Sequence, residues 1–410
     1  MTSADPGQPG SGELLLRDLL AGAAGDDPYP AYARLREQAP VLVTRSGAVI
    51  LSRFADIWET LRNPGLGKPE QGYAALIGRA PGSEVQAAMH RWQHTILFAN
   101  PPEHTRLRRL ISDQFTPRHI GRLQDQVAAT TDCYLDRLDG HAEPDFISTV
   151  AQPLPARVIA DLLGIPGTDW QELAGTVRDL VTLFEPAAPP DAAARAITAG
   201  DQLSGFLAPV LAAKRRHPAD DLLSRLATAR DTDSLDDTEM TATAILLFAA
   251  GFETTVNLLG NGLHALLTHP GQLARLRQQP GLIPGAVEEF LRFDSPVQMT
   301  SRAALRPCQA AGLQLTPGQP VVVLLGAGNR DPARFTRPDQ LDVTRDEGTA
   351  LSFATGAHFC LGAHLARMEA AEVFTRLLAR YRHIDLASPP RHRPGTSLRG
   401  LAELRITTRR

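Results

Sequence analysis

The chain has 410 residues, of which 43% are hydrophobic and 21% charged, and its formal net charge is −3. These values are ordinary for a globular domain, and the nearly balanced charge excludes a strongly basic surface for nucleic acids or anionic membranes. We therefore expect no nucleic-acid partner and no membrane partner, and we expect the protein to be a monomer.

The first residues are polar and rich in Gly and Pro, and they lack the basic and apolar regions of a signal peptide. The longest apolar run, residues 244–251, is far shorter than the roughly 20 residues that span a bilayer. Three cysteines are too few for a disulfide framework, which favours a reducing compartment. We predict a cytoplasmic protein with a flexible N-terminal segment over 1–27 and a single domain over 28–410.

Apolar residues recur mostly with the period of helices, and the strand-like segments are few and short. This pattern predicts a mainly α fold with a small β region. The predicted helices cover residues 30–38, 54–62, 104–113, 119–138, 146–163, 168–184, 192–215, 235–268, 282–293 and 361–380. The predicted strands cover residues 40–44, 48–52, 300–304, 320–325 and 401–407.

The longest predicted helix, residues 235–268, follows Ser234, and an acid three residues after this serine makes a variant of the capping box. Pro270 marks its end, because proline cannot continue the hydrogen-bond ladder. At 1.5 Å per residue such a helix is about 50 Å long. It can therefore cross the whole body of a domain.

Within residues 240–263 of this helix the only charged residue is Glu253. Leu247, Ala250 and Thr254 share one face, which is narrow enough around Ala250 for a planar ligand. The Thr254 hydroxyl can donate to the Ala250 carbonyl and favour a kink there. An acid and a hydroxyl beside a kink could relay protons into a dry pocket, although a buried helix with an internal ion pair has the same pattern.

The segment SFATGAHFCLGAHLAR places Cys360 just before a predicted helix. Free N–H groups at a helix start favour a thiolate. Four interpretations remain open from these residues alone: a small buried hydrophobe, a zinc ligand together with His358 and His364, a hydrolase nucleophile with His358 as its base, and an axial ligand of haem iron.

Two further patterns place opposite or like charges together. Glu289 and Arg292 are three residues apart and can pair on one helix face, either as an exposed pair or as a buried one. His104 and Arg108 lie four apart on a helix that follows two prolines, and this can be a solvated basic face. Together with Arg302 and His358, that pair could clamp two carboxylates.

Five segments in this order resemble the motifs of a bacterial cytochrome P450, the soluble haem–thiolate monooxygenases, and are similar to actinomycete members that tailor natural products. The segments are PPEHTRLRR (101–109), AGFETT (250–255), EFLR (289–292), NRDPARFTRPDQLDVTR (329–345) and FATGAHFCLGAHLAR (353–367). The chain departs from the family pattern at two positions, with Ala354 where glycine is usual and Asn100 where aspartate is frequent.

The resemblance implies a fold with a long central helix over haem b, and it assigns roles by position. It implies Cys360 as the iron ligand, Glu253 and Thr254 as the acid–alcohol pair, and Glu289 with Arg292 as a buried structural pair joined by Arg337. The haem propionates are implied to bind His104, Arg108, Arg302 and His358. The implied substrate pocket includes Leu247, Ala250, Val297, Met299 and Leu398.

The resemblance also implies a small, mostly apolar, polyketide-like substrate and a separate ferredoxin with its reductase as electron donors. Arginines near Arg106, Arg109 and Arg367 are candidates for receiving that acidic partner. Residues 80–96 are interpreted either as a mobile lid or as a surface loop. The alternatives are oxidative coupling or rearrangement without net hydroxylation, and a non-catalytic module that recruits a carrier protein.

Overall fold

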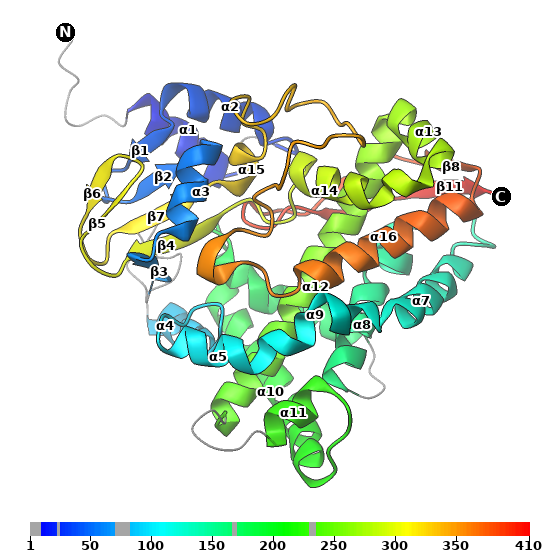
Figure 1. The fold of residues 1–410 in the computed structure, drawn as a ribbon, viewed down its shortest axis with the longest axis horizontal. Coiled ribbons are helices and arrows are strands. Elements are labelled where there is room, and N and C mark those ends of the chain that lie inside the picture. The colour runs from blue at the N-terminus through cyan, green and yellow to red at the C-terminus, as the bar shows by residue number, and fades with distance from the viewer. Residues whose placement is uncertain (1–9, 23–24, 70–82, 166–169, 229–234) are drawn as a thin grey trace.

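The computed structural model describes residues 10–22, 25–69, 83–165, 170–228 and 235–410. Figure 1 shows a mainly helical molecule with the sheet and the first helices on one side and α12 running through the middle. The predicted fold class is confirmed. The helices are α1 (Ser11–Leu20), α2 (Tyr29–Gln38), α3 (Phe54–Arg62), α4 (Ser83–Gln93), α5 (Glu103–Ser112), α6 (Pro117–Gly121), α7 (Gln124–Asp136), α8 (Pro153–Leu163), α9 (Trp170–Val181), α10 (Ala192–Arg216), α11 (Leu222–Thr228), α12 (Asp237–Thr268), α13 (Pro270–Gln278), α14 (Ile283–Phe293), α15 (Leu325–Gly328) and α16 (Ala363–Arg380).

The main sheet joins the N-terminal part of the chain to a segment near residue 300. Its strand order is β1-β2-β7-β4-β3; β2 and β7 pair in parallel and the other neighbours are antiparallel. Three two-stranded sheets pair β5 with β6, β8 with β11 and β9 with β10. The strands are β1 (Val41–Val43), β2 (Val49–Leu51), β3 (Leu66–Gly67), β4 (Thr300–Ala304), β5 (Cys308–Ala310), β6 (Leu313–Leu315), β7 (Pro320–Val323), β8 (His383–Leu386), β9 (Arg391–His392), β10 (Leu401–Glu403) and β11 (Ile406–Arg409).

Helix α12 begins two residues later than its predicted start. Asp236 is the N-cap, and it forms a reciprocal capping box with Glu239, in which each side chain accepts from the other's backbone N–H. The predicted cap Ser234 lies outside the described residues. The helix ends at Thr268, before Pro270 as expected.

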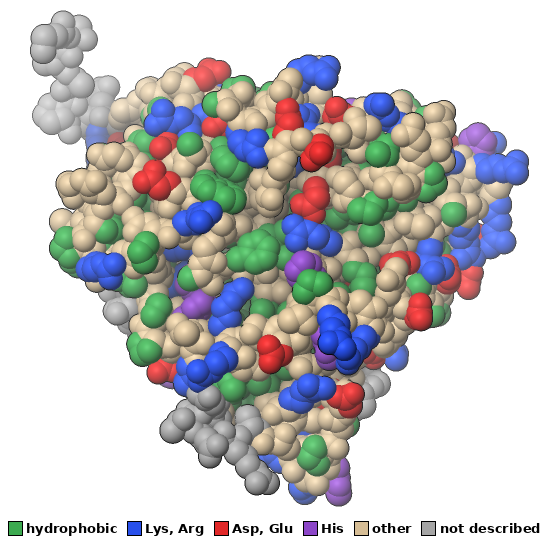
Figure 2. All heavy atoms as spheres, viewed as in Figure 1, with side chains coloured by type: hydrophobic (Ala, Val, Ile, Leu, Met, Phe, Trp, Pro, Cys, Tyr) green, Lys and Arg blue, Asp and Glu red, His purple; other side chains and the backbone are tan. Residues whose placement is uncertain are grey.

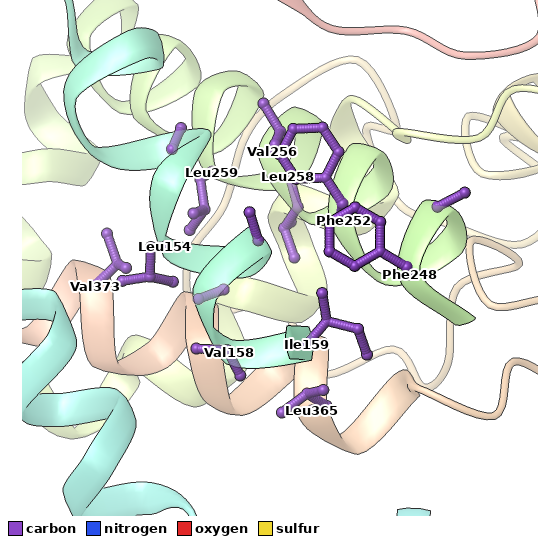
Figure 3. Close-up of a cluster of buried hydrophobic side chains, with 14 of the residues drawn as sticks. Leu154, Val158, Ile159, Phe248, Phe252, Val256, Leu258, Leu259, Leu365 and Val373 are labelled. Carbon is purple, nitrogen blue, oxygen red and sulfur yellow. The ribbon is translucent and has the colours of Figure 1, made fainter. Parts of the chain in front are cut away.

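Most side chains of α12 are buried against neighbouring helices. Figure 3 shows Phe252 and Leu259 of α12 packed with Leu154 of α8 and Val373 of α16 in one apolar cluster. By length and hydropathy alone α12 could cross a membrane, and it is the one such helix among the described residues. However, 83% of that apolar window is buried inside the fold, so its apolar surface is already covered.

The predicted flexible segment 1–27 is partly ordered. Within it, α1 packs beside α2 and buries Leu16 and Leu19. Helices α1, α4, α11, α13 and α15 have no counterpart in the prediction; α11 and α15, with seven and four residues, are too short to show a helical period. Residues 80–96, interpreted from the sequence as a lid or a surface loop, contain helix α4, in which Met89 and Trp92 are buried.

Two predicted helices and one predicted strand are interrupted. Residues 119–138 form α6 and α7, and 401–407 belongs to two strands, β10 and β11. In 146–163 one π-helical turn, Ile147–Ala151, precedes α8, which begins at Pro153. Proline lacks the N–H that would continue the ladder, so a regular helix has to start anew there.

Candidate active site

A chamber of about 280 Å³ lies between α12 and the loop that leads into α16. Leu247, Ala250 and Thr254 line it from α12, and Cys360 lines it from the loop. The sequence motifs on the long helix and at the cysteine, more than one hundred residues apart, therefore meet in one cavity. Most of the remaining lining is apolar and includes Ile96, Phe115, Ile159, Leu246, Leu258, Val297, Phe353 and Leu365.

The cysteine loop is tightly closed on itself. The Cys360 N–H donates to the Phe353 carbonyl at 3.0 Å. Gly356 has φ +75°, and a Cβ there would lie 2.3 Å from the Leu61 carbonyl oxygen, so only glycine fits. Ala354 has φ +55°, in the left-handed region where a Cβ is unfavourable. The departure from glycine at position 354 thus leaves a strained residue in an otherwise regular loop.

The thiol of Cys360 is not activated by its helix alone. Burial raises its pKa, and the Gly362 N–H, Arg108 and Arg367 oppose that rise only partly. The sequence led us to expect that the helix start favours a thiolate. Burial of the sulfur opposes that effect, and coordination to a metal ion would stabilise the thiolate.

A cluster of basic residues, called the cation cluster below, lies at one side of the chamber. Arg302 on β4 is buried, Arg108 on α5 donates to the Phe359 carbonyl at 2.9 Å, and the rings of His104 and His358 have centroids 4.2 Å apart. Burial, reinforced by the neighbouring cations, lowers the pKa of His104 to about 4 and also lowers that of His358. The four residues predicted as one group are therefore brought together.

Lys68 is a fifth member of this cation cluster, and sequence reasoning missed it. The side chain is buried, and its Nζ donates to Thr300 Oγ1 at 3.3 Å. Burial, and then Arg302, lower its pKa well below the usual value. Its backbone is fixed by Asn100, which accepts from the Lys68 N–H at 2.7 Å and donates to the Lys68 carbonyl at 2.9 Å. An aspartate at position 100 could only accept, which gives the second departure a physical reason.

The acid and the alcohol on α12 open into different cavities. Thr254 Oγ1 donates to the Ala250 carbonyl at 2.8 Å and lines the chamber. Glu253 is buried, forms an ion pair with Arg393, and lines a second, more polar cavity with Arg178. Its Oε2 has no hydrogen-bond partner among the described residues. A proton bound to Glu253 would therefore lie in the second cavity, outside the chamber that Thr254 lines.

Residues 193–280 and 281–402 match the family model for cytochrome P450. The chain is 38% identical over 407 residues to cytochrome P450 107B1 of Saccharopolyspora erythraea, with 95% of this chain and 97% of that protein covered. The chain belongs to the cytochrome P450 family.

Two solved cytochrome P450 structures are similar over nearly the whole chain. One is P450BioI in complex with an acyl carrier protein ligated with hexadec-9Z-enoic acid, at 35% identity and a TM-score of 0.86, covering 93% of this chain and 99% of that one. The other is PksS, the cytochrome P450 of the Bacillus subtilis 168 bacillaene polyketide synthase, at 30% identity and a TM-score of 0.84, covering 96% and 99%. This protein is therefore a bacterial-type cytochrome P450 monooxygenase.

A cytochrome P450 holds its haem through a cysteine thiolate, and the residues of this chamber fit that group. Cys360 opens onto the chamber, and the Nε2 atom of His104, whose ring contacts that of His358 in the chamber wall, is buried without a partner in the described chain. No Asp or Glu of that part is among the groups that shift the pKa values of Lys68, Arg108 and His358, so the cation cluster suits an added dianion. No group of three or more metal-binding side chains occurs in the described ranges, so the zinc alternative through His358, Cys360 and His364 is not formed.

Three of the five residues predicted for the substrate pocket line the chamber, and two do not. Leu247, Ala250 and Val297 line the chamber. Met299 instead packs in the core beneath the N-terminal helices, because the strand direction turns it to the opposite face of the sheet from Thr300. Leu398 lines the second cavity, although it forms a β-bridge with Val297.

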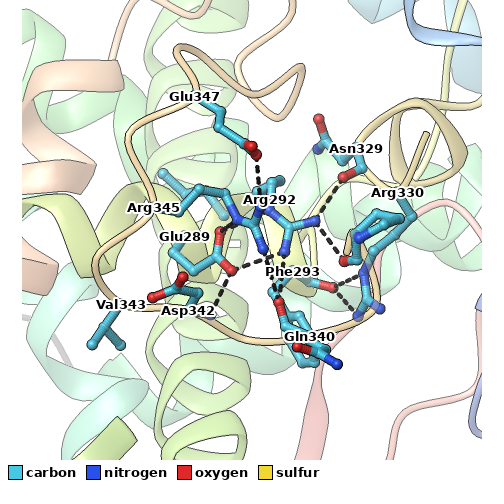
Figure 4. Close-up of polar contacts among 12 residues, drawn as sticks. Glu289, Arg292, Phe293, Asn329, Arg330, Gln340, Asp342, Val343, Arg345 and Glu347 are labelled. Carbon is cyan, nitrogen blue, oxygen red and sulfur yellow. Dashed lines mark hydrogen bonds and ion pairs between the residues drawn. The ribbon is translucent and has the colours of Figure 1, made fainter. Parts of the chain in front are cut away.

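The Glu289–Arg292 pair is buried and fully hydrogen-bonded (Figure 4). Its two N–H···O contacts measure 2.7 and 2.8 Å. Arg345 completes the cluster, with Nε 3.0 Å from Glu289 and Nη1 2.6 Å from Glu347. The prediction that Arg337 joins the pair is wrong: Arg337 contributes its carbonyl, to Arg345.

The arginines proposed for a redox partner already have acidic neighbours. Arg106 pairs with Glu103 at 2.8 Å and with Glu239, and Arg367 pairs with Glu288. Figure 2 shows Lys and Arg side chains interspersed with Asp and Glu on this face, which α5 and α16 form in Figure 1. The local charge is therefore more balanced than the sequence suggested.

Glu185 ties two distant segments together at the edge of the second cavity. Its carboxylate accepts backbone N–H groups from Thr396 at 2.6 Å, Ser397 at 2.9 Å and Leu398 at 3.0 Å. Glu185 follows the short helical turn Thr182–Phe184 after α9, whereas its donors precede β10. Glu185 therefore links the turn after α9, at the edge of the second cavity, to the loop that precedes β10.

Proposed function

We propose that this cytochrome P450 uses haem b bound at Cys360 to insert one oxygen atom of O2 into a mostly apolar, polyketide-like natural product. The observation that carries the proposal is the meeting of Cys360, the cation cluster and Thr254 around a single apolar chamber. When bound, the haem supplies the redox chemistry that activates O2 and oxidises a C–H bond.

Cys360 and the cation cluster hold the cofactor. The thiol gives up its proton when Sγ becomes a ligand, because coordination stabilises the thiolate that burial disfavours. His104, Arg108, Arg302 and His358 are the proposed propionate ligands, and the site geometry adds Lys68. A propionate near His104 would raise the pKa of this ring, so that binding takes up protons.

Glu253 and Thr254 are the proposed proton relay. The Thr254 hydroxyl opens onto the chamber, and Glu253 faces the polar second cavity, where it is held by Arg393. A carboxylate can take a proton from solvent on that side only after its ion pair with Arg393 opens. The side chain can then pass the proton around α12 to the hydroxyl of Thr254, while the apolar lining excludes bulk water.

The substrate and partners are inferred from the lining and from the relatives. Apolar residues dominate the chamber, and one relative is named as the cytochrome P450 of a bacillaene polyketide synthase while another is in complex with an acyl carrier protein. We infer an apolar substrate, offered free or on a carrier, with electrons from a ferredoxin and its reductase. A cytoplasmic monomer is part of the same proposal.

The test is the spectrum and turnover of the full chain reconstituted with hemin. The reduced, CO-bound protein should show the red-shifted Soret band of thiolate-ligated haem, and Cys360→Ser should lose it. Cys308→Ser is the matched control, since that sulfur lies outside the chamber and should leave the band intact. Retention of the band in Cys360→Ser would overturn the proposal.

Turnover is then followed with free and carrier-bound apolar acids. Thr254→Ala should divert electrons from product to hydrogen peroxide while the haem spectrum is kept, because the relay is broken. Products that carry a new hydroxyl or epoxide support oxygen insertion. Coupled or rearranged products without added oxygen would support the alternative reaction, and binding without any product would support a recruitment module.

A further inference from the structure

One buried acid of the chamber has no part in the proposed reaction. Glu369 lies on α16, lines the chamber, and is 2% exposed. Its Oε2 is shut off from solvent and has no hydrogen-bond partner in the described part of the chain. An unpartnered buried carboxylate is strongly unfavourable, so such a group keeps its proton to a higher pH than usual. Burial raises the pKa of Glu369 to about 8.

No neighbouring cation compensates this carboxyl, since burial is the cause of its shift. Helices α6, α7, α12 and α14 pack against α16. Helix α6 carries Arg118 and His119, and neither is among the causes of the shift. The titratable and charged groups on the other helices include Asp125, Asp132 and Asp136 on α7, Asp237, Glu239, Glu253 and His264 on α12, and Glu288, Glu289 and Arg292 on α14; α16 itself adds His364, Arg367, Glu372, Arg376 and Arg380. None of these groups is among the causes of the shift, and neither are Lys68, Arg108, Arg302 and His358, which line the same chamber.

Glu369 shares an enclosure with the proposed iron ligand. Helix α16 starts three residues after Cys360, and Glu369 follows six residues later, about 9 Å along the helix axis. Both residues line the same apolar chamber. Charges in such an enclosure interact far more strongly than in water, so a change of charge at one is felt at the other.

We propose that Glu369 is a proton-loading residue of the chamber, which takes up a proton from water when an electron enters the cofactor bound at Cys360. This inference rests on the proposed function. In the balanced step, a one-electron donor is oxidised, the cofactor gains one electron, and a carboxylate oxygen of Glu369 gains one proton; the only bond formed is O–H. The uptake is measurable above about pH 8, where the carboxyl is ionised before the electron arrives.

The test is a spectroelectrochemical titration of the haem-loaded full chain from pH 6 to 10, with dithionite as reductant. The midpoint potential of the wild type should be level at low pH and shift negative above about pH 8. Glu369→Gln should remove that shift, and Glu369→Asp should restore it. Glu372→Gln is the control on the same helix, because its carboxyl pairs with Arg376 outside the chamber, and it should behave as the wild type.

An unchanged shift in Glu369→Gln, with the thiolate spectrum intact, would overturn the inference while leaving the proposed function standing. A second readout is the urea unfolding of the full chain. Because the folded pKa is raised, the folded chain keeps a proton that the unfolded chain has released between about pH 4.5 and 8. The unfolding free energy of the wild type relative to Glu369→Gln should fall across that range; a constant difference would also overturn the inference.

Discussion

Two buried charge clusters in this molecule differ in how their charge is balanced. In the cluster around Glu289, two arginines meet two carboxylates, and the remaining N–H groups donate to backbone carbonyls. In the cation cluster around His104, Lys68 has a hydroxyl and an aromatic ring as its neighbours in place of a carboxylate. The charges of the first cluster are paired within the chain, whereas no Asp or Glu is among the groups that shift the pKa values of Lys68, Arg108 and His358 in the second.

The difference explains why substitutions in the Glu289 cluster should mainly affect the stability of the fold, whereas substitutions in the cation cluster should mainly affect ligand binding. A compensated buried pair holds segments together, and its loss strands a charge. An uncompensated group of cations opposes folding and is retained where it binds something. Substitutions in the two clusters should therefore change the stability of the full chain in opposite directions.

The largest change in the free energy of unfolding is expected in the cluster around Glu289. Arg292→Leu leaves Glu289 buried with half of its partners, and should lower the free energy of unfolding by about 3–5 kcal/mol. Arg376→Leu, in a half-exposed pair, should lower it by less than about 1 kcal/mol. Urea unfolding of the full chain measures both. Equal effects would contradict the distinction between a buried pair and a surface pair.

The next effect concerns pH and the cation cluster. The pKa of His104 is lowered to about 4, against 6.5 for a free ring, so between these values only the unfolded chain binds the proton. His104 should therefore contribute about 2–3 kcal/mol to the fall in the free energy of unfolding without hemin as the pH drops from 6.5 to 4. His104→Gln should remove this share and leave the share of His358, whose pKa is also lowered, whereas the exposed His217→Gln should retain the full dependence.

A smaller effect of opposite sign is expected at Lys68. Lys68→Met removes a desolvated ammonium, so the full chain without hemin should be as stable as the wild type or up to about 1 kcal/mol more stable. Hemin affinity should nevertheless fall about tenfold, which corresponds to about 1.4 kcal/mol. Lys214→Met is the matched control, because this lysine pairs with Asp221 and should affect stability and not hemin binding.

The smallest effect is at the strained loop residue. Ala354→Gly relieves a left-handed alanine and should raise the free energy of unfolding by about 0.5–1 kcal/mol, after allowance for the greater freedom of glycine in the unfolded chain. Thermal unfolding of both proteins measures this. A loss of stability would show that the loop does not keep this conformation.

The residues that the sequence could identify lie in local patterns. Cys360 stands before a helix, Glu289 and Arg292 are three apart, and Thr254 follows Glu253, so periodicity and resemblance were enough to find them. The long helices were likewise predictable from their many apolar positions, as were α2, α3 and α5, whereas five other helices and the π-helical turn were not.

The missed residues are joined by long-range contacts alone. Arg393 is 140 residues from Glu253, Arg345 is 56 from Glu289, and Lys68 is 232 from Thr300. No local spacing in the sequence indicates such partners, since these contacts depend on how the sheet and the C-terminal loop fold back on α12. The wrong choice of Arg337 in place of Arg345 has the same origin.

The carboxylate of Glu185 has a mechanical consequence. Three amide groups from the C-terminal loop converge on it, so any hinge motion of the turn after α9 must drag that loop along or break three bonds together. The loop in turn touches Val297 through a strand-like bridge. A displacement of the turn after α9 is therefore coupled, through the loop before β10 and its bridge to Val297, to the wall of the chamber.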